Sequence, residues 1–437
     1  MSAPRPVRHD IVDTTVLEVY GLVHDQAWLA DRALEVVLRR ERRLYANERR
    51  AVAEAVYGMV RSRRRIDWAL GGRARPSDHG ARYAAWLAEQ GGVQPIAAAR
   101  RLGVDPKVLE PISTLPAALA RIADPLERLA VEESIPTWIA ERFVTELGAD
   151  EARALARAMN QRAPLTVRAN TLRGTREALQ QRLQGEGVSS TPTPYSPWGL
   201  VLDGHANAFA LAAFRDGLFE IQDEGSQLIA LAVGARPGHK VVDACAGAGG
   251  KTLALAMEMR NRGEIAALDV DEGRLEETRR RARRDGVHNV RTRVVPADPA
   301  EADAAVAQLA GADRVLVDAP CSGLGTLRRK PDARWRLKPG DPERFAGLQL
   351  ELARRHAALV RPGGRFVYAT CAIGPAENDE VAARVHAEVP GLEPLPAAEA
   401  LGPELAAALG ADGHLVKLYP HRHGTDGFFI ACFKRVG

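Results

Sequence analysis

Two cysteines fifty positions apart are the residues of this chain whose types and spacing could do chemistry. Cys321 stands in the segment Asp-Ala-Pro-Cys-Ser-Gly (318–323), and Cys371 stands in Tyr-Ala-Thr-Cys (368–371). Each follows an apolar run of strand length, so each thiol is expected at the end of a strand. A single cysteine is more often a small buried apolar residue. Two at neighbouring strand ends, with Asp318 beside them, favour covalent attack on an electrophilic ring, because thiolates are strong nucleophiles.

A glycine-rich turn at 243–252 precedes both cysteines in the sequence. It has Cys245 where a P-loop requires its first glycine, and Thr252 where a dinucleotide fingerprint requires its third. What remains is a tight strand-to-helix turn where a ligand can approach bare backbone. Lys251, within the turn, is the cation that could stabilise a thiolate. Cys245 and Cys432 have no such partners in the sequence and are interpreted as packing residues.

Two aspartates follow the turn at the ends of predicted strands. Asp269 lies twenty residues after Gly249, where a carboxylate can hold ribose hydroxyls. Asp298 ends the next strand, where it could meet an adenine edge. Each alone is also typical of ordinary strand-end turns. Together with the glycine turn they favour an adenosyl cofactor. S-adenosylmethionine has no phosphates, so it suits a turn that matches neither phosphate motif.

The elements that position these residues fall into three predicted domains. Helical periodicity indicates an all-α domain at 1–132, and mixed patterns indicate a small α/β domain at 133–216. From 217 to 437, strands and helices alternate, which predicts an α/β fold with a parallel, Rossmann-like sheet and helices on both faces. Ligands bind such sheets at the carboxyl ends of the strands, where the motifs are expected to lie.

Composition and cysteine spacing argue against a membrane-spanning, a secreted or a metal-binding protein. The 437 residues are 46% hydrophobic with a net charge of +4, and no apolar run approaches the roughly 20 residues of a membrane span. The first ten residues lack the apolar core of a secretory signal. The four cysteines show no metal-ligand spacing, which predicts free thiols, no metal and a cytoplasmic location.

Two segments combine positive charge in a way that could serve RNA binding. Eleven arginines lie between residues 32 and 65, and residues 328–336 combine cations with Trp335. Such segments can bind phosphates and stack a base. They can equally be a solvated helical face and a solvated loop, and composition alone does not decide between these interpretations.

Taken together, these motifs resemble the RsmB/NOP/Sun family of RNA cytosine-C5 methyltransferases. The matching segments are 243–252, 267–275, 318–335, 363–381 and 423–434, of which the Asp-Ala-Pro-Cys-Ser-Gly and Tyr-Ala-Thr-Cys pair is the most specific. Residues 160–179 and 219–230 are similar to the segment before the family's catalytic domain, and residues 48–70 to the NusB-like helical domain of the bacterial rRNA branch. The resemblance thus covers nearly the whole chain. One departure is Gly247-Ala248, where the family usually has Ala-Pro.

The resemblance implies roles for the catalytic residues. Cys371 would attack C6 of cytosine, after which C5 would take the methyl group of S-adenosylmethionine. A base would then remove the C5 proton, and Cys321 would assist release of the enzyme. Asp318 would bind the N3/N4 edge of the cytosine, with Lys251 close to the ring.

The resemblance also implies a cofactor pocket, in which Asp269 would hold the ribose and Asp298 the adenine side. The pocket would comprise Cys245, Ala246, Gly247, Ala248, Gly249, Gly250, Lys251, Asp269, Asp298 and Asp318. The expected partner is RNA, with 16S rRNA favoured and tRNA as the alternative, and the expected enzyme is a monomer without a membrane partner. Two rivals stay open: a DNA cytosine-C5 methyltransferase with Cys321 as nucleophile, and a non-catalytic RNA-binding or ribosome assembly factor.

Overall fold

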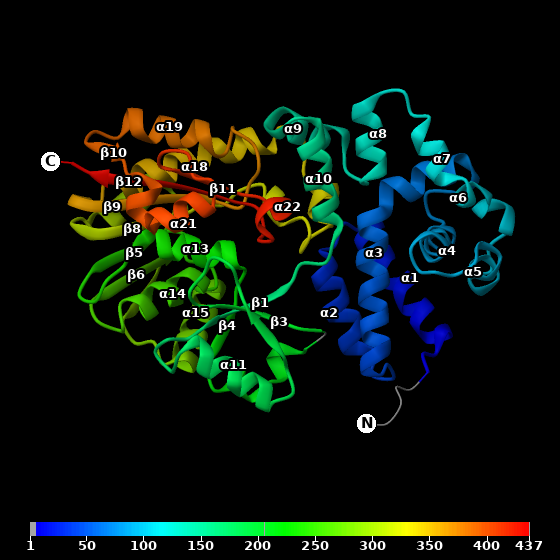
Figure 1. Ribbon diagram of the computed structural model, residues 1–437, viewed down its shortest axis with the longest axis horizontal. Helices are drawn as coiled ribbons and strands as arrows, with labels where there is room; N and C mark the ends of the chain where they lie inside the picture. Colours follow the sequence, from blue (N-terminus) through cyan, green and yellow to red (C-terminus); the bar gives the residue numbers. More distant parts are fainter. Residues whose placement is uncertain (1–5, 205, 437) are drawn as a thin grey trace. The chain divides into compact units, whose positions relative to one another are not determined.

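The computed structural model describes residues 6–204 and 206–436, and the chain divides into two compact units (Figure 1). The first unit comprises residues 1–162 with 327–339, and the second comprises 163–326 with 340–437. Each has hydrophobic core clusters of its own. Among the residues that the structure describes, no helix is long and apolar enough to cross a membrane.

The first unit is helical throughout its described part. Its helices are α1 (His9–Asp25), α2 (Ala30–Arg40), α3 (Ala46–Leu70), η1 (Gly71–Arg73), α4 (His79–Glu89), α5 (Pro95–Leu102), η2 (Pro106–Leu109), α6 (Glu110–Ser113), α7 (Leu115–Ala120), α8 (Pro125–Glu132), α9 (Thr137–Leu147), α10 (Ala149–Asn160) and α17 (Ala333–Arg336). The long α3 buries Val52, Val56 and Met59, which share one face because they are three or four residues apart. The all-α architecture predicted for the N-terminal region is thereby confirmed.

The second unit contains a small antiparallel sheet with the order β2-β3-β1-β4. Its elements are β1 (Leu165–Ala169), α11 (Arg176–Gly185), β2 (Ser190–Pro192), β3 (Gly199–Leu202), η3 (Ala208–Ala210), α12 (Ala212–Arg215) and β4 (Phe219–Ile221). Strand β4 pairs with β1 in the register Val167↔Ile221. The segment just after residue 216 therefore completes this small sheet.

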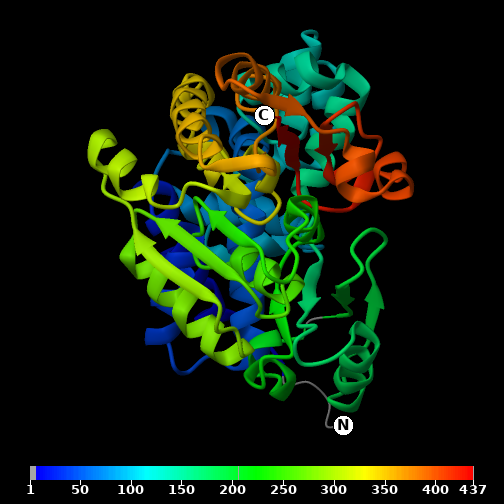
Figure 2. The same ribbon diagram turned by 90° about the vertical axis from the view of Figure 1, so that its left-hand side faces the viewer.

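The large sheet of the second unit has the order β10-β12-β9-β8-β5-β6-β7, with β11 paired to β12 (Figure 2). Its strands are β5 (Lys240–Asp243), β6 (Glu264–Asp269), β7 (Val290–Val294), β8 (Ala312–Asp318), β9 (Val360–Thr370), β10 (Leu392–Pro394), β11 (Leu415–Leu418) and β12 (Phe428–Arg435). The strands from β5 to β9 are parallel, as the sequence predicts. The antiparallel edge of β10, β11 and β12 is an addition that the alternating pattern does not reveal.

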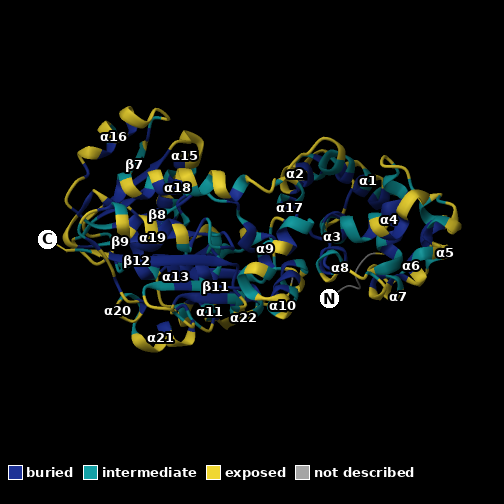
Figure 3. Cartoon of the chain, turned by 90° about the horizontal axis from the view of Figure 1, so that it is seen from above, coloured by how far each residue is buried: buried dark blue, intermediate teal, exposed yellow. Residues whose placement is uncertain are grey.

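Helices cover both faces of this sheet. The helices of this part of the chain are α13 (Glu224–Val233), α14 (Gly250–Glu258), α15 (Glu272–Asp285), α16 (Pro299–Ala307), η4 (Leu324–Thr326), α18 (Asp341–Ala357), α19 (Asp379–Glu388), α20 (Ala397–Leu401), α21 (Pro403–Ala408) and α22 (Pro420–His423), and all but η4 and α22 contribute to the two core clusters on the sheet. Val241 packs with α13, α14 and α15, and its neighbour Val242 packs with α16, α18 and α19. This alternation follows from the two-residue period of a strand, and it leaves the central strands β5, β8 and β9 mostly buried between the helices (Figure 3).

Candidate active site

The glycine-rich turn connects the end of β5 to the start of α14. Gly247 and Gly249 have φ angles of 54° and 85°, a backbone conformation that favours glycine. At Gly249, a Cβ would lie 2.8 Å from the side chain of Thr278 on α15. At Gly247, a Cβ would meet no heavy atom within 4 Å. The turn is therefore closed on the side of α15 and open at Gly247, where a ligand could reach the backbone.

Asp269 ends β6 and lies at this turn. Its carboxylate accepts hydrogen bonds from the backbone N–H of Gly247 at 2.8 Å and of Asp271 at 2.9 Å. The side chain is 8% exposed. The structure thus brings Asp269 and the glycine turn together, and its position beside the open backbone is compatible with a ribose contact.

If the turn holds the adenosyl cofactor that the sequence predicts, replacing Asp269 with alanine is expected to weaken S-adenosylmethionine binding by about 1–3 kcal/mol, because a hydrogen-bond acceptor is lost and Gly247 loses its support. Isothermal titration calorimetry measures this change. Asp271→Ala is the matched control, since Asp271 caps α15 and lies two residues away. Unchanged affinity in Asp269→Ala would remove this carboxylate from the cofactor site.

Asp298 does not lie at the end of a strand, and Cys245 packs against the hydrophobic core. Asp298 lies four residues beyond the end of β7 and caps α16, accepting from the N–H groups of Ala300 and Glu301 at 3.0 Å each. Its contact with an adenine stays a prediction. Cys245 is partly buried and packs against the core cluster that contains α16 and α18, and burial raises the pKa of its thiol.

The two thiols meet at the ends of neighbouring parallel strands. Strands β8 and β9 pair in the register Asp318↔Ala369, so both chains leave the sheet at the same edge. The sulfurs of Cys321 and Cys371 lie 3.3 Å apart. The hydrogen bond with Cys371 and burial raise the pKa of Cys321 well above its usual value. Two thiols separated by fifty positions in the sequence are thus in contact at one edge of the sheet.

Lys251 and Asp318 form an ion pair next to these thiols. The Lys251 ammonium lies 2.5 Å from the Asp318 carboxylate, and the side chains are 12% and 25% exposed. Burial alone would lower the pKa of Lys251, but Asp318 outweighs it and, with a smaller contribution from Cys371, holds the pKa above its usual value. Lys251 therefore stays protonated at neutral pH, and its charge acts on the Cys371 sulfur.

A buried carboxylate that the sequence reasoning missed supports the Cys321 loop. Glu377 is 1% exposed and accepts from the Ser322 N–H at 2.8 Å, the Ser322 hydroxyl at 2.5 Å and the Gln349 amide at 3.0 Å. Gln349 also donates to the carbonyl of Pro320 at 2.9 Å. Bonds on both sides of Cys321 therefore fix its position. No local pattern signals this role, because the partners lie far away in the sequence.

A second missed network links the small sheet to the glycine turn. Arg168 on β1 donates to the carbonyl of Gly250 at 2.7 Å, and burial lowers the pKa of this guanidinium to about 10. Arg281 on α15 donates to the carbonyl of Ala248 at 2.6 Å and pairs with buried Glu220 at 2.6 Å. The turn is thus held by Arg168 of the small sheet and by Arg281 of α15.

Two family models match this chain. The model described as 16S rRNA methyltransferase RsmB/F matches residues 230–434, and the model described as the RsmF/B-like ferredoxin-like domain matches residues 135–208. The first match contains the thiol pair, and the second contains strands β1 to β3.

Relatives and solved structures agree with these models. A Bacillus subtilis protein described as a probable ribosomal RNA small subunit methyltransferase B is 35% identical over 72% of this chain and 70% of that protein. A Synechocystis protein of the same description is 33% identical over 70% of this chain and 68% of that protein. The crystal structure of PH0851 has a TM-score of 0.79 at 26% identity, covering 99% of this chain and all of that one. A methyltransferase homologue from Pyrococcus horikoshii has a TM-score of 0.60 at 30% identity, covering 72% of this chain and all of that one.

Proposed function

This chain belongs to the RsmB/F family of ribosomal RNA methyltransferases, and from that membership we propose that it methylates C5 of a cytosine in 16S rRNA with S-adenosylmethionine. The observation that carries the proposal is the pair of sulfurs 3.3 Å apart, beside a protonated lysine and its carboxylate partner. A reaction at C5 needs such a nucleophile, because C5 of cytosine is unreactive until a bond forms at C6.

The residues of the turn fit the cofactor. Open backbone at Gly247 and the Asp269 carboxylate beside it offer a surface for an adenosyl group with no phosphates. Lys251, Asp318 and the turn residues 245–250 would complete the pocket, and Asp298 would lie on its adenine side. Bound there, S-adenosylmethionine supplies an electrophilic methyl group.

The two thiols have different roles in the covalent reaction. Cys371, as thiolate, forms a bond to C6 of a cytosine that has left its stack, and the electron pair moves toward C5. The Lys251 ammonium stabilises the negative sulfur before attack. After C5 is methylated, a base takes the C5 proton, and its electron pair expels Cys371 from C6. Cys321, in contact with the departing sulfur, assists this release.

Asp318 would distinguish cytosine from the other pyrimidine, uracil. Its carboxylate accepts hydrogen bonds, and the exocyclic amino group of cytosine donates them, so the contact suits cytosine and not uracil. The ion pair with Lys251 orients the carboxylate for this contact.

The proposal predicts 5-methylcytidine in 16S rRNA. Protein-free 16S rRNA transcript, incubated with the purified chain and S-adenosylmethionine labelled in its methyl group, should yield labelled 5-methylcytidine after nuclease digestion and chromatography. Parallel incubations contain tRNA and double-stranded DNA. Label on another nucleoside would refute the chemistry, and label in tRNA or DNA alone would establish a rival substrate.

A further inference from the structure

The arginines between residues 32 and 65 are mostly engaged within the first unit. Arg40 pairs with Glu18 at 2.5 Å, and Arg64 pairs with Glu127 at 2.6 Å. Within the described ranges, four of the eleven make no side-chain hydrogen bond or ion pair: Arg39, Arg42, Arg50 and Arg63. Arg63 differs from the other three because its guanidinium lies over the indole of Trp335, 5.5 Å from the ring centre.

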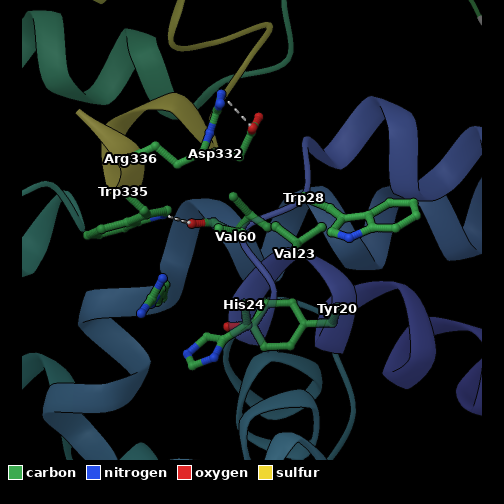
Figure 4. Close-up of a pocket in the computed structure, with 10 residues that line it drawn as sticks. Tyr20, Val23, His24, Trp28, Val60, Asp332, Trp335 and Arg336 are labelled. Atoms are coloured by element: carbon green, nitrogen blue, oxygen red, sulfur yellow. Dashed lines mark hydrogen bonds and ion pairs between the residues drawn. The ribbon is translucent and has the colours of Figure 1, made fainter.

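Arg63 lines a pocket of about 210 Å³ that lies wholly within the first unit (Figure 4). Trp335 and Trp28 lie on opposite sides of Val23 and Val60 in this pocket. Trp335 comes from α17, and Trp28 comes from the loop between α1 and α2. The pocket therefore offers two indoles, an apolar floor and a cation that forms no ion pair with any residue in the described ranges.

The indole of Trp335 is fixed in place. Its N–H donates to the carbonyl of Val60 at 2.8 Å, so the ring offers its surface and no free donor. The preceding residue, Arg334, is fully buried and donates to the Asn160 side chain at 2.7 Å. A rigid aromatic surface loses little conformational entropy when a flat ligand stacks on it.

A buried acceptor lies at the edge of the pocket. Asp332 is 7% exposed, and its Oδ2 lies 3.0 Å from the Arg336 guanidinium. That oxygen accepts no hydrogen bond of normal geometry from the residues the structure describes. An amino group of a ligand could supply the missing donor.

We propose that this pocket binds one unpaired nucleobase of the substrate RNA, distinct from the cytosine that is methylated. The base stacks on an indole, its amino group approaches Asp332, and the adjoining phosphate contacts Arg63. Single-stranded RNA is bound by aromatic surfaces that stack its bases and by cations that contact its phosphates, and this pocket has both. An acidic peptide would use the arginine and not the indoles, and an aliphatic peptide would use the indoles and not the arginine. The inference rests on the proposed function and adds an RNA contact outside the catalytic site.

Filter binding of the full-length chain to labelled, protein-free 16S rRNA transcript tests this pocket. Trp28→Ala is expected to raise Kd about tenfold, the loss of one stacked base. Arg63→Gln is expected to raise Kd by a similar factor and to lower the slope of log Kd against log salt by about one, the loss of one phosphate contact. Ultraviolet cross-linking should attach a nucleotide to the peptide that contains Trp28 or Trp335.

Trp68→Ala is the matched control, because Trp68 is 38% exposed, Trp28 is 36% exposed, and Trp68 does not line the pocket. It should change Kd less than twofold, and equal melting temperatures in the two variants show that both are folded. Equal Kd values for Trp28→Ala and Trp68→Ala would overturn the proposal. So would unchanged binding to naked RNA with reduced methylation of ribosomal particles, which would indicate a protein occupant. Methyl transfer by the wild type in the same preparation tests the proposed function separately.

Discussion

Cys371→Ala is expected to abolish methyl transfer, with a fall in rate on the order of 10⁴-fold or more, because the only atom assigned to attack C6 is removed. Neither a covalent enzyme–RNA adduct nor 5-methylcytidine should form. Binding of S-adenosylmethionine should change little, because the glycine turn and Asp269 remain intact. Transfer of labelled methyl groups to 16S rRNA transcript measures the rate, and calorimetry measures the cofactor affinity.

Cys321→Ala should give the opposite phenotype. The nucleophile remains, so the C6 bond forms, but the thiol in contact with the departing sulfur is gone and release is slowed. A covalent enzyme–RNA complex should therefore accumulate. A denaturing gel of the variant with transcript and cofactor should show a shifted band that ribonuclease removes.

Cys432→Ala is the control for thiol loss in general. Cys432 lies in β12, is fully buried and packs in the hydrophobic core, so the variant should keep its activity where it folds. A trapped band with Cys371→Ala and none with Cys321→Ala would reverse the two roles, as in the DNA-methyltransferase interpretation. No band with either variant, while the wild type methylates RNA, would refute the release role of Cys321.

Asp318→Asn is expected to lower the free energy of unfolding of the second unit by about 2–3 kcal/mol at neutral pH, because Lys251 would remain largely buried without its counter-charge. Activity should fall as well, since the amide no longer holds the ammonium beside the thiols. Urea denaturation measures the stability. The double variant Lys251→Met/Asp318→Asn should recover part of the loss, because it buries neither charge.

The stability change should depend on pH in a defined direction. The wild-type pKa of Lys251 stands above its usual value, so the stabilisation by the pair is present at neutral pH and is lost as pH rises through that pKa. Without Asp318, burial lowers the pKa of Lys251. The difference between wild type and Asp318→Asn should therefore be largest near pH 7 and shrink above about pH 10. A difference that does not vary with pH would contradict the assignment to this ion pair.

Features that depend on local rules can be predicted from the sequence. Gly247 and Gly249 indicate a turn with left-handed backbone, and the alternating pattern predicts parallel strands whose carboxyl ends share an edge. Those two rules bring Asp269 to the glycine turn and Cys321 to the edge that also carries Cys371. The family resemblance implies the roles of these residues without any distance.

The partners of side chains that are distant in the sequence could not be predicted in this way. The 3.3 Å contact of the thiols, the support of Ser322 by Glu377 and the use of Asp298 as a helix cap depend on packing that no spacing rule contains. The same holds for arginine. Arg64 and Arg63 are neighbours in sequence, but Arg64 pairs with Glu127 while Arg63 lies over Trp335. Both residues carry the same charge in the sequence, and the fold determines that Arg64 has a carboxylate partner while Arg63 has none among the described residues.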